Sequence, residues 1–359
     1  MYHLYPTNIN FVLGILGARG VPNRHGGFEA LAEHLLRNCA HSGIECEVVG
    51  NRDRPVSSTV IGRITSLTGF RSLETPLRTW SQRYRALRHD VVLVVNPINV
   101  LTALFVQNCG RRVLLHMDGM EEMRQKWGPV ARRTHSVARQ IAIRSSLELV
   151  TDSKAIQDWY HREFQRGSIF IPYGGCQHAE KDQAHSWSEE EVDDYFLVVA
   201  RPEPENQVYE VCSAFLSSTS PWRLIVVGAP AHPTRYWKRL HRLVGDSPRI
   251  QLAGSIYDRD RLCGLYMGCR GVIHGHTVGG TNPSLVDALS HGCPVFAHGN
   301  PYNKEVVGDS SPTWDNEDEL RDFFSANLDP RATVDVQEFI SRYNWTDVTQ
   351  QYLKAFGFL

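Results

Sequence analysis

Short apolar runs rich in β-branched residues recur along this chain, and segments with helical spacing of apolar positions separate them. The runs fall at 9–16, 45–50, 90–95, 112–116, 147–151 and 168–171, and the series restarts at 195–199 and continues at 223–227, 249–254, 271–274 and 294–297. Runs that are apolar throughout are typical of strands buried on both faces, as in a parallel sheet covered by helices. The pattern predicts an α/β protein with two doubly wound lobes that face a central cleft.

The polar, glycine-bearing segment 174–192 is the best candidate for a linker between the lobes. A chain of 359 residues is long enough for two domains that each bury their own core. We therefore expect a first domain over residues 1–176 and a second over 177–340. The remaining segment, 341–359, has a helical pattern and is expected either to close the second lobe or to cross back to the first.

Charge is divided unevenly between the two halves of a nearly neutral chain. Residues 1–178 carry a net charge of +8 and the remainder −9, so the whole chain does not indicate a nucleic-acid partner. A basic half, with its arginine-rich and aromatic stretch at 78–88, suits an anionic acceptor or peripheral contact with an anionic membrane. An unevenly charged but simply solvated surface is an equally good interpretation.

The eight cysteines are scattered and contain no CxxC pair, which favours a reduced, cytoplasmic protein. Residues 1–8 lack the basic region and apolar core of a signal peptide, and no apolar run approaches the roughly 20 residues of a membrane span. We expect a cytoplasmic location, with any membrane contact peripheral and on the inner face of the plasma membrane.

The segment 271–297 reads as a strand, a glycine turn at 279–280 and the start of a helix. Asn282 stands where an N-cap belongs, and Pro283 occupies the first helical position that proline favours. The backbone N–H groups of residues 281–285 would then face the strand ends, where the helix dipole favours a phosphate. Asp287 would be close enough to accept hydrogen bonds from sugar hydroxyls. An ordinary strand-to-helix connection is the alternative.

The loop after the first strand, GARGVPNRHGGFE, can also present backbone N–H groups, at Gly26 and Gly27, to a phosphate or sugar. Gly14, Gly17 and Gly20 spell GxxGxxG, a nucleotide-binding pattern of oxidoreductases, which makes an NAD(P)-dependent oxidoreductase a rival hypothesis. The helix begins too late for that pattern, and the chain has no YxxxK pair for hydride chemistry.

Charged residues follow other predicted strands. Arg201 follows the strand at 195–199 and can clamp a diphosphate, unless it only pairs with Glu203 or Glu205. The strand at 112–116 brings His116 and Asp118 to the rim of the first lobe, where a carboxylate can orient an acceptor hydroxyl or take its proton. Turn chemistry explains an Asp before Gly equally well.

Asp258 and Asp260 form a DxD motif, which holds a metal-bound diphosphate in many sugar transferases. Helix signals follow immediately, so we interpret Asp258 as an N-cap and Asp260 as a first-turn charge. No His/Cys cluster has zinc spacing, and no metal site is predicted.

Taken together, the motifs resemble those of retaining GT-B glycosyltransferases of family 4, and in particular the bacterial rhamnosyltransferases that build capsular and exopolysaccharide repeat units. The resemblance runs from about Leu13 to Gly308. It is carried by GARGVPNRHGGFE, DGMEEMRQKW, TDSKAIQDWY, IPYGG, VARPEPEN, HGHTVGGTNPSLVDAL and PYNKEVVG.

The resemblance implies a nucleotide-diphosphate sugar in the C-terminal lobe and an acceptor in the N-terminal lobe. The donor-binding residues that it implies are Gly26, Gly27, Arg201, Asn206, Gly280, Thr281, Asn282 and Asp287. Those implied near the reacting atoms are His116, Asp118 and Gly279, and those near the acceptor are Arg19, His25, Glu121 and Arg124. The chain departs from the usual motifs at Asn206, where a diphosphate lysine is usual, and at Gly279, where a glutamate is usual.

The resemblance implies a hexosyltransferase of polysaccharide biosynthesis that moves L-rhamnose from dTDP-rhamnose to a saccharide or lipid-linked saccharide acceptor with retention. The leaving phosphate would take the acceptor proton, so neither a protein nucleophile nor a metal or other cofactor is required. A family 4 transferase that uses another UDP-, dTDP- or GDP-hexose on a small acceptor remains an alternative. The others are the oxidoreductase and a non-catalytic sugar-nucleotide-binding module.

Overall fold

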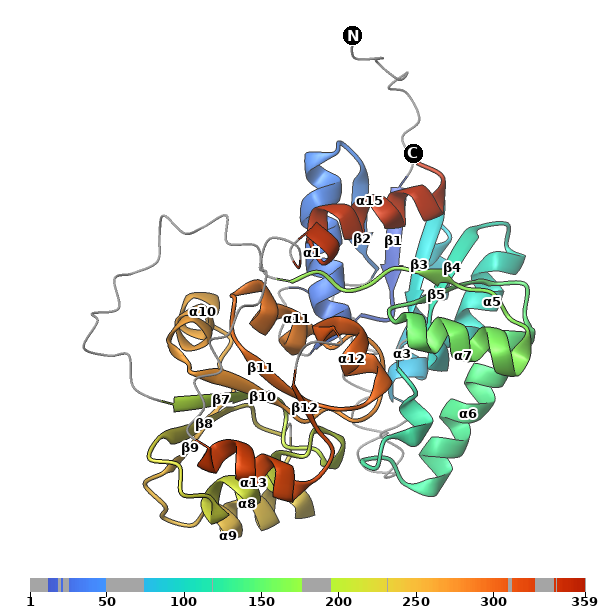
Figure 1. The fold of residues 1–359 in the computed structure, drawn as a ribbon. Helices are drawn as coiled ribbons and strands as arrows, with labels where there is room; N and C mark the ends of the chain where they lie inside the picture. The colour runs from blue at the N-terminus through green and yellow to red at the C-terminus, as the bar shows by residue number, and fades with distance from the viewer. Residues whose placement is uncertain are drawn as a thin grey trace.

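The computed structural model describes residues 12–18, 21, 26–49, 74–117, 119–175, 195–230, 232–308, 312–326, 339 and 341–358. Within these residues the strands form two parallel sheets of six strands each. Each sheet separates two apolar clusters, because helices pack on both of its faces (Figure 1). The predicted α/β class with two doubly wound lobes is confirmed.

The N-terminal lobe contains the sheet with strand order β2-β1-β3-β4-β5-β6. Its strands are β1 (Val12–Leu16), β2 (Glu45–Val48), β3 (Val91–Val95), β4 (Arg112–His116), β5 (Glu148–Thr151) and β6 (Ile169–Phe170). Its helices are α1 (Gly27–His41), α3 (Glu74–Ser81), α4 (Arg83–Ala86), α5 (Val100–Asn108), α6 (Pro129–Arg144) and α7 (Lys154–Phe164). Short 3₁₀ turns at Pro97–Asn99 and Glu121–Met123 follow β3 and β4.

Strand β3 shows why the strands read as uninterrupted apolar runs. Its five residues, VVLVV, are all buried. Successive side chains of a strand point to opposite faces, so Val91, Leu93 and Val95 pack into one cluster. Val92 and Val94 pack into the other. A strand with helices on both faces has no position left for a polar side chain.

The C-terminal lobe contains the sheet with strand order β12-β11-β10-β7-β8-β9. Its strands are β7 (Tyr195–Val199), β8 (Arg223–Val227), β9 (Ile250–Gly254), β10 (Gly271–His274), β11 (Val295–His298) and β12 (Thr313–Trp314). Its helices are α8 (Val208–Ser217), α9 (Arg235–Val244), α10 (Arg259–Gly268), α11 (Pro283–Ser290), α12 (Pro301–Val307) and α13 (Glu317–Ser325). A 3₁₀ turn at Pro204–Asn206 follows β7.

The last helix, α15 (Trp345–Phe356), packs on the N-terminal lobe, beside α1 (Figure 1). Its apolar face joins the cluster of β1 and α1 through Trp345, Val348, Tyr352, Leu353 and Phe356. Asn38 of α1 donates hydrogen bonds from Nδ2 to the carbonyl of Trp345 (3.0 Å) and to Thr349 Oγ1 (2.9 Å). The predicted domain boundaries at residues 176 and 340 lie outside the described residues.

Each sheet reverses its winding direction once, between β1 and β3 in the first and between β7 and β10 in the second. At such a point the loops that leave neighbouring strands separate to opposite faces, which opens a crevice beyond the carboxyl ends of the strands. The loops after β7 and β10 contain Arg201 and the 275–282 segment. The loop after β1 contains the first glycine-rich segment, and the 117–127 segment follows β4, the strand next to β3.

Candidate functional site

A cleft of about 780 Å³ lies between the lobes, and the loops that leave both switch points line it. The C-terminal lobe contributes Arg201, the N-terminus of α11 and part of α10. The N-terminal lobe contributes the start of α1, the segment after β4 and Tyr173. Open α/β sheets bind ligands at this kind of position.

The N-terminus of α11 is built as its sequence predicts. Asn282 Oδ1 accepts hydrogen bonds from the backbone N–H of Ser284 (3.1 Å) and from Ser284 Oγ (2.9 Å), and Pro283 is the first helical residue. The predicted N-cap is therefore confirmed. The backbone of Gly280 to Asn282 lines the cleft just before the helix. These features direct the positive end of the helix dipole into the cleft.

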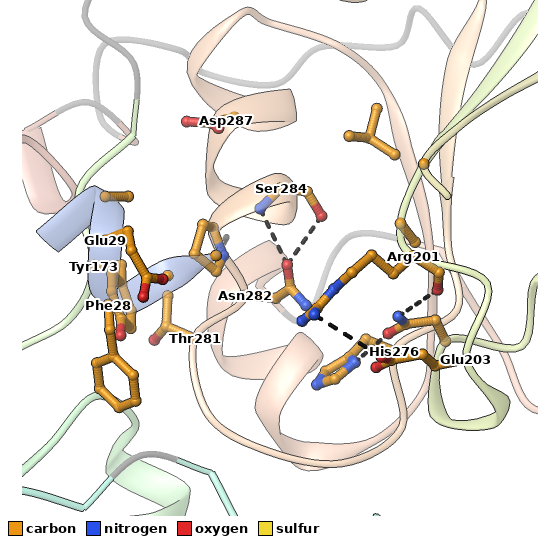
Figure 2. Close-up of a pocket in the computed structure, with 18 of the residues that line it drawn as sticks. Phe28, Glu29, Tyr173, Arg201, Glu203, His276, Thr281, Asn282, Ser284 and Asp287 are labelled. Atoms are coloured by element: carbon orange, nitrogen blue, oxygen red, sulfur yellow. Dashed lines mark hydrogen bonds and ion pairs between the residues drawn. The ribbon is translucent and has the colours of Figure 1, made fainter. Parts of the chain in front are cut away.

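The N-terminus of α1 reaches the same place from the opposite lobe (Figure 2). A Cβ atom on Gly27 would lie only 3.4 Å from Pro283 Cγ and 3.2 Å from the Tyr173 hydroxyl. Gly26, the N-cap residue of α1, has a φ of 152°, which L side chains rarely adopt. The two helix N-termini therefore meet across the cleft, and both dipoles favour a negative charge between them.

The loop segment 279–281 is in close contact with the N-terminal lobe. A Cβ on Gly119 would lie 2.5 Å from Gly279 Cα, and a Cβ on Gly280 would lie 1.9 Å from Asp152 Oδ1. Thr281, which is buried, donates a hydrogen bond from Oγ1 to the backbone carbonyl of Asp152. Only residues without a side chain at 119 and 280 allow the lobes to approach this closely.

Arg201 lies at the cleft, with its side chain 47% exposed and directed toward Asn282 and His276 (Figure 2). Its guanidinium is 3.9 Å from the carboxylate of Glu203, a loose ion pair. The two interpretations of Arg201, an ion pair with Glu203 and a clamp for a diphosphate, are therefore compatible. A half-exposed guanidinium with one distant partner keeps most of its hydrogen-bond donors available to a ligand.

Lys126 reaches the same carboxylate from the N-terminal lobe. Its ammonium lies 3.2 Å from Glu203 Oε2 and 3.7 Å from Glu205 Oε1. Burial raises the pKa of Glu203, but the charges of Lys126 and Arg201 outweigh burial and keep that pKa below its usual range. For Glu205 burial dominates and raises the pKa. A chain of alternating charges thus connects Arg201 to the opposite lobe.

Asn206 uses its side-chain amide to shape the loop after β7. Its Nδ2 donates to the carbonyl of Arg201 (2.8 Å), and its Oδ1 lies 2.6 Å from His276 Nδ1. Burial, followed by the charge of Arg124, holds the pKa of His276 well below its ordinary value, so the imidazole is neutral. Asn206 lines the cleft, and in this arrangement it fixes the backbone of Arg201 and orients His276.

Gly279 and Arg124 lie together where the lobes meet. Gly279 has a φ of 118°, and a Cβ there would be 3.4 Å from His276 Nε2 and 3.6 Å from a terminal nitrogen of Arg124. Arg124 Nε lies 2.9 Å from Glu121 Oε1, and Glu121 Oε2 accepts a hydrogen bond from Trp127 Nε1 (2.7 Å). Glu121 therefore orients Arg124 toward the 279–280 turn of the C-terminal lobe.

His116 is at the end of β4 but lies behind the cleft wall. It is buried beside the rings of Phe28 (5.3 Å between centroids) and Tyr173 (5.9 Å), and burial lowers its pKa to about 3. The other predicted residues of this rim, Arg19, His25 and Asp118, fall outside the described residues.

Asp287 lies one turn into α11 and lines the cleft (Figure 2). In α10, Asp258 Oδ1 accepts a hydrogen bond from the N–H of Arg261 (3.0 Å), which confirms the predicted N-cap, and Asp260 is in the first turn. The described residues contain no group of three or more His, Cys, Asp or Glu side chains arranged to hold a metal ion.

The first two glycines of the GxxGxxG pattern have packing roles. Gly14 lies inside β1, where a Cβ would be 2.7 Å from His89 Cγ. Gly17 has a φ of 101°, and a Cβ there would be 2.8 Å from the carbonyl oxygen of Val95. Because α1 begins only at Gly27, Gly14 and Gly17 do not form the tight turn into a helix that dinucleotide binding requires.

Sequence reasoning missed His276 and Tyr173 as cleft residues, and it considered Glu203 only as an ion-pair partner of Arg201. His276 follows a predicted strand, so its position at the carboxyl end of β10 was a usable signal. The pairing of Lys126 with Glu203 joins residues 77 positions apart on different lobes. No local pattern in the sequence indicates such a pair.

Known structures share the fold of this protein over nearly the whole chain. HepE from Anabaena, in complex with UDP-glucose, is 14% identical, with a TM-score of 0.67 over 97% of this chain and 99% of its own. Sucrose-phosphate synthase from Thermosynechococcus elongatus is 12% identical, with a TM-score of 0.70 over 96% and 98%. A glycosyltransferase involved in avilamycin A biosynthesis is 16% identical, with a TM-score of 0.58 over 96% and 97%.

No protein-family model and no curated protein sequence matches the chain. In the described part of the molecule, no helix combines the length and the apolar character that crossing a bilayer requires. The likeness to the solved structures extends over both lobes and the helices between the strands. The chain therefore has the GT-B fold that the sequence motifs predicted.

Proposed function

We propose that this protein is a glycosyltransferase that takes a sugar from a nucleoside diphosphate. The observation that carries the proposal is the meeting of the N-termini of α1 and α11 across the cleft, with Arg201 beside them. Two helix dipoles and a guanidinium favour a multiply charged anion, and a diphosphate is the anion that a cleft of this size can accommodate together with a nucleoside and a sugar.

In the proposed donor complex, Arg201 and the backbone of Gly280 to Asn282 hold the diphosphate from the C-terminal lobe. Gly26 and Gly27 approach the same phosphates from the N-terminal lobe. Asp287, one turn into α11, accepts hydrogen bonds from the ribose hydroxyls. Asn206 acts indirectly, because its amide fixes the backbone of Arg201.

The donor nucleotide is proposed to carry a pyrimidine. HepE, which shares the fold, was crystallised with UDP-glucose, and this makes UDP the first nucleotide to test. The motif resemblance favours L-rhamnose from dTDP-rhamnose, so the dTDP-linked deoxyhexose is the second. UDP and dTDP share the diphosphate and the pyrimidine face, and only the ribose 2′-hydroxyl and the base methyl group differ.

Transfer is proposed to proceed with retention, the acceptor hydroxyl attacking from the face that the diphosphate leaves. The leaving phosphate oxygen accepts the hydroxyl proton, and Arg201 together with the two helix N-termini stabilises the charge that develops on it. Arg124, oriented by Glu121, faces this region from the N-terminal lobe. Closure of the lobes positions both substrates and excludes water.

The acceptor is proposed to be a saccharide, lipid-linked in the cell, that binds the N-terminal lobe at a membrane surface. Trp80, Tyr84 and Leu101 are exposed apolar side chains of this lobe, and Arg83 lies over the rings of Trp80 (4.6 Å) and Tyr84 (4.3 Å). Aromatic and basic side chains together suit an anionic bilayer. Sedimentation with vesicles that contain anionic lipid, compared with neutral vesicles, tests this contact, and equal recovery from both contradicts it.

Incubation with a panel of UDP-, dTDP- and GDP-sugars, followed by measurement of nucleotide release and of transfer to oligosaccharides, tests the activity. We expect release from a UDP- or dTDP-sugar. Nucleotide affinity without release from any donor indicates a binding module instead. Binding of a nicotinamide dinucleotide, with no affinity for nucleotide sugars, overturns the proposal in favour of the oxidoreductase.

A further inference from the structure

A thiol and an imidazole face each other on the wall of the cleft, at a place to which the proposed reaction assigns no role. Cys263 of α10 and His291, which follows α11, both line the cleft. Cys263 Sγ lies 3.2 Å from His291 Nε2. This distance is short enough for a hydrogen bond between the two side chains.

The hydrogen bond on the other side of the ring determines what His291 can do. His291 Nδ1 lies 2.7 Å from the backbone carbonyl oxygen of Asp287. A carbonyl oxygen can only accept, so Nδ1 must carry a proton. In the neutral ring Nε2 is then unprotonated and directed at the thiol, which is the arrangement in which an imidazole removes a proton from a cysteine.

The surroundings hold this pair in place. The ring of His291 stacks on Tyr266, with centroids 5.0 Å apart and planes 22° apart, and the Tyr266 hydroxyl donates to the carbonyl of Ser284. Burial lowers the pKa of His291, but its contacts with Cys263 and the Asp287 carbonyl outweigh burial and raise that pKa above its usual value. An imidazolium at this distance stabilises a thiolate.

The other thiols of the described residues have different environments. Cys46 is partly buried, but it is hydrogen-bonded to the buried thiol of Cys39 and does not line the cleft. Cys212, Cys269 and Cys293 are buried, and burial raises the pKa of Cys212 to about 12. Cys109 is exposed, at the end of α5 in the opposite lobe. Among the described thiols, Cys263 therefore combines partial burial, a position on the cleft wall and a histidine partner.

We propose that Cys263 is an activated thiol and a modification site for disulfides and alkylating electrophiles. The group that they attach to Cys263 blocks the nucleotide side of the cleft. With a disulfide RSSR, the Cys263 thiolate attacks one sulfur, a mixed disulfide forms and RS⁻ leaves, and the proton released by Cys263 passes through His291 to the leaving thiolate. A dithiol reverses the step. The device makes donor binding sensitive to the thiol–disulfide balance around the protein.

The effect on the donor rests on the proposed function. Asp287, which is proposed to bind the ribose, supplies the carbonyl that orients His291 and lines the same wall of the cleft. A group of tripeptide size attached to Cys263 would occupy the space that the nucleoside needs. Reactivity of the thiol does not depend on any activity of the protein, so the two parts can be tested separately.

The first experiment measures the thiol itself. The full chain is labelled with iodoacetamide at pH 7, and the rates at Cys263 and Cys109 are followed by peptide mass spectrometry in the same sample. We expect Cys263 to react about tenfold faster than the more exposed Cys109, and His291→Asn to abolish most of this advantage while Cys109 is unchanged. A Cys263 rate at or below that of Cys109 in the unmodified protein overturns the proposal, whether or not the variant folds.

The second experiment measures the consequence. The protein is treated with glutathione disulfide, and UDP affinity is measured by calorimetry before treatment, after treatment and after addition of dithiothreitol. We expect glutathione disulfide to lower the UDP affinity about tenfold or more and dithiothreitol to restore it. The same treatment should leave the UDP affinity of the Cys263→Ser variant unchanged. If the protein is shown to carry the adduct at Cys263 and its UDP affinity is unchanged, the proposed blocking of the nucleotide side is wrong. Absence of UDP binding before treatment instead contradicts the proposed function and leaves the labelling result intact.

Discussion

Gly280 is a residue whose value lies in the absence of a side chain. A Cβ there would lie 1.9 Å from Asp152 Oδ1. The close contact between the lobes therefore requires a residue with only a hydrogen atom in place of a side chain. The two glycines at 279–280 were predicted from the sequence as residues that let the backbone turn before the helix. The structure adds a different reason for Gly280, because its neighbour is on the other lobe and 128 positions earlier in the chain.

We predict that Gly280→Ala separates the lobes at this contact and lowers the melting temperature, at a cost of about 1–3 kcal/mol for overpacking. Gly167→Ala is the matched control, because a Cβ there has no neighbour within 4 Å. Thermal unfolding of both variants is the measurement. If the Gly280 variant unfolds at the same temperature as the control, the contact is softer than the structure shows.

Arg201 is the side chain on which the proposed donor site depends most. Arg201→Ala is expected to weaken UDP binding by about 1.5–3 kcal/mol, because a charge-assisted hydrogen bond to the diphosphate is lost. Arg321→Ala is a suitable control: its side chain is 42% exposed, close to the 47% of Arg201, and it pairs with Asp318 on α13. Calorimetric titration with UDP distinguishes them, and equal affinities would place the diphosphate elsewhere.

At the scale of elements, helix α7 is capped by a carboxylate from the other lobe. Glu305 of α12 accepts hydrogen bonds from Ser153 Oγ (2.6 Å) and from the backbone N–H groups of Lys154 (2.8 Å) and Ala155 (3.1 Å). Ser153 is itself the N-cap residue of α7, but its side chain makes no cap hydrogen bond to the helix. An N-cap from a distant segment satisfies the helix and holds the lobes together.

Replacement of Glu305 by Ala is expected to destabilise the protein by about 1–2 kcal/mol, since two backbone N–H groups lose their acceptor and a charge leaves the positive end of the helix dipole. Glu317→Ala is the comparison, because Glu317 is an exposed acid in the first turn of α13 within a single lobe. Urea unfolding measures both. An effect of Glu305→Ala no larger than that of Glu317→Ala would show that water replaces the cap.

The starts of α10 and α11 were predictable from sequence, and the cap of α7 was not. Asp258 and Asn282 cap the helices they immediately precede, and local chemistry of this kind is visible in a few consecutive residues. Glu305 is about 150 positions from the residues it caps. The sequence around α7 has a serine, Ser153, at the expected N-cap position. Sequence alone would assign the cap to this serine, and nothing nearby in the chain indicates that Glu305 provides it.

At the scale of the whole molecule, α15 makes the last segment of the chain part of the first lobe. Leu353 is 2% exposed and belongs to the cluster beneath α1 and β1. We predict that Leu353→Ala costs about 2–5 kcal/mol, because it leaves a cavity in the N-terminal lobe. Leu101→Ala, at a position 61% exposed on the same lobe, should cost less than about 0.5 kcal/mol. Chemical denaturation compares them, and similar values would mean that α15 docks only loosely.

The alternation of apolar strands with amphipathic helices determined the fold class, because strands buried on both faces must be apolar throughout and that requirement is written in consecutive residues. The same local logic located the turns and helix starts at which a phosphate is expected. The tertiary structure decided which of these ends meet. Gly27 approaches Pro283, Lys126 pairs with Glu203 and Cys263 faces His291 only because two lobes and two neighbouring helices are packed together. Contacts between distant segments depend on packing, which no short stretch of sequence encodes.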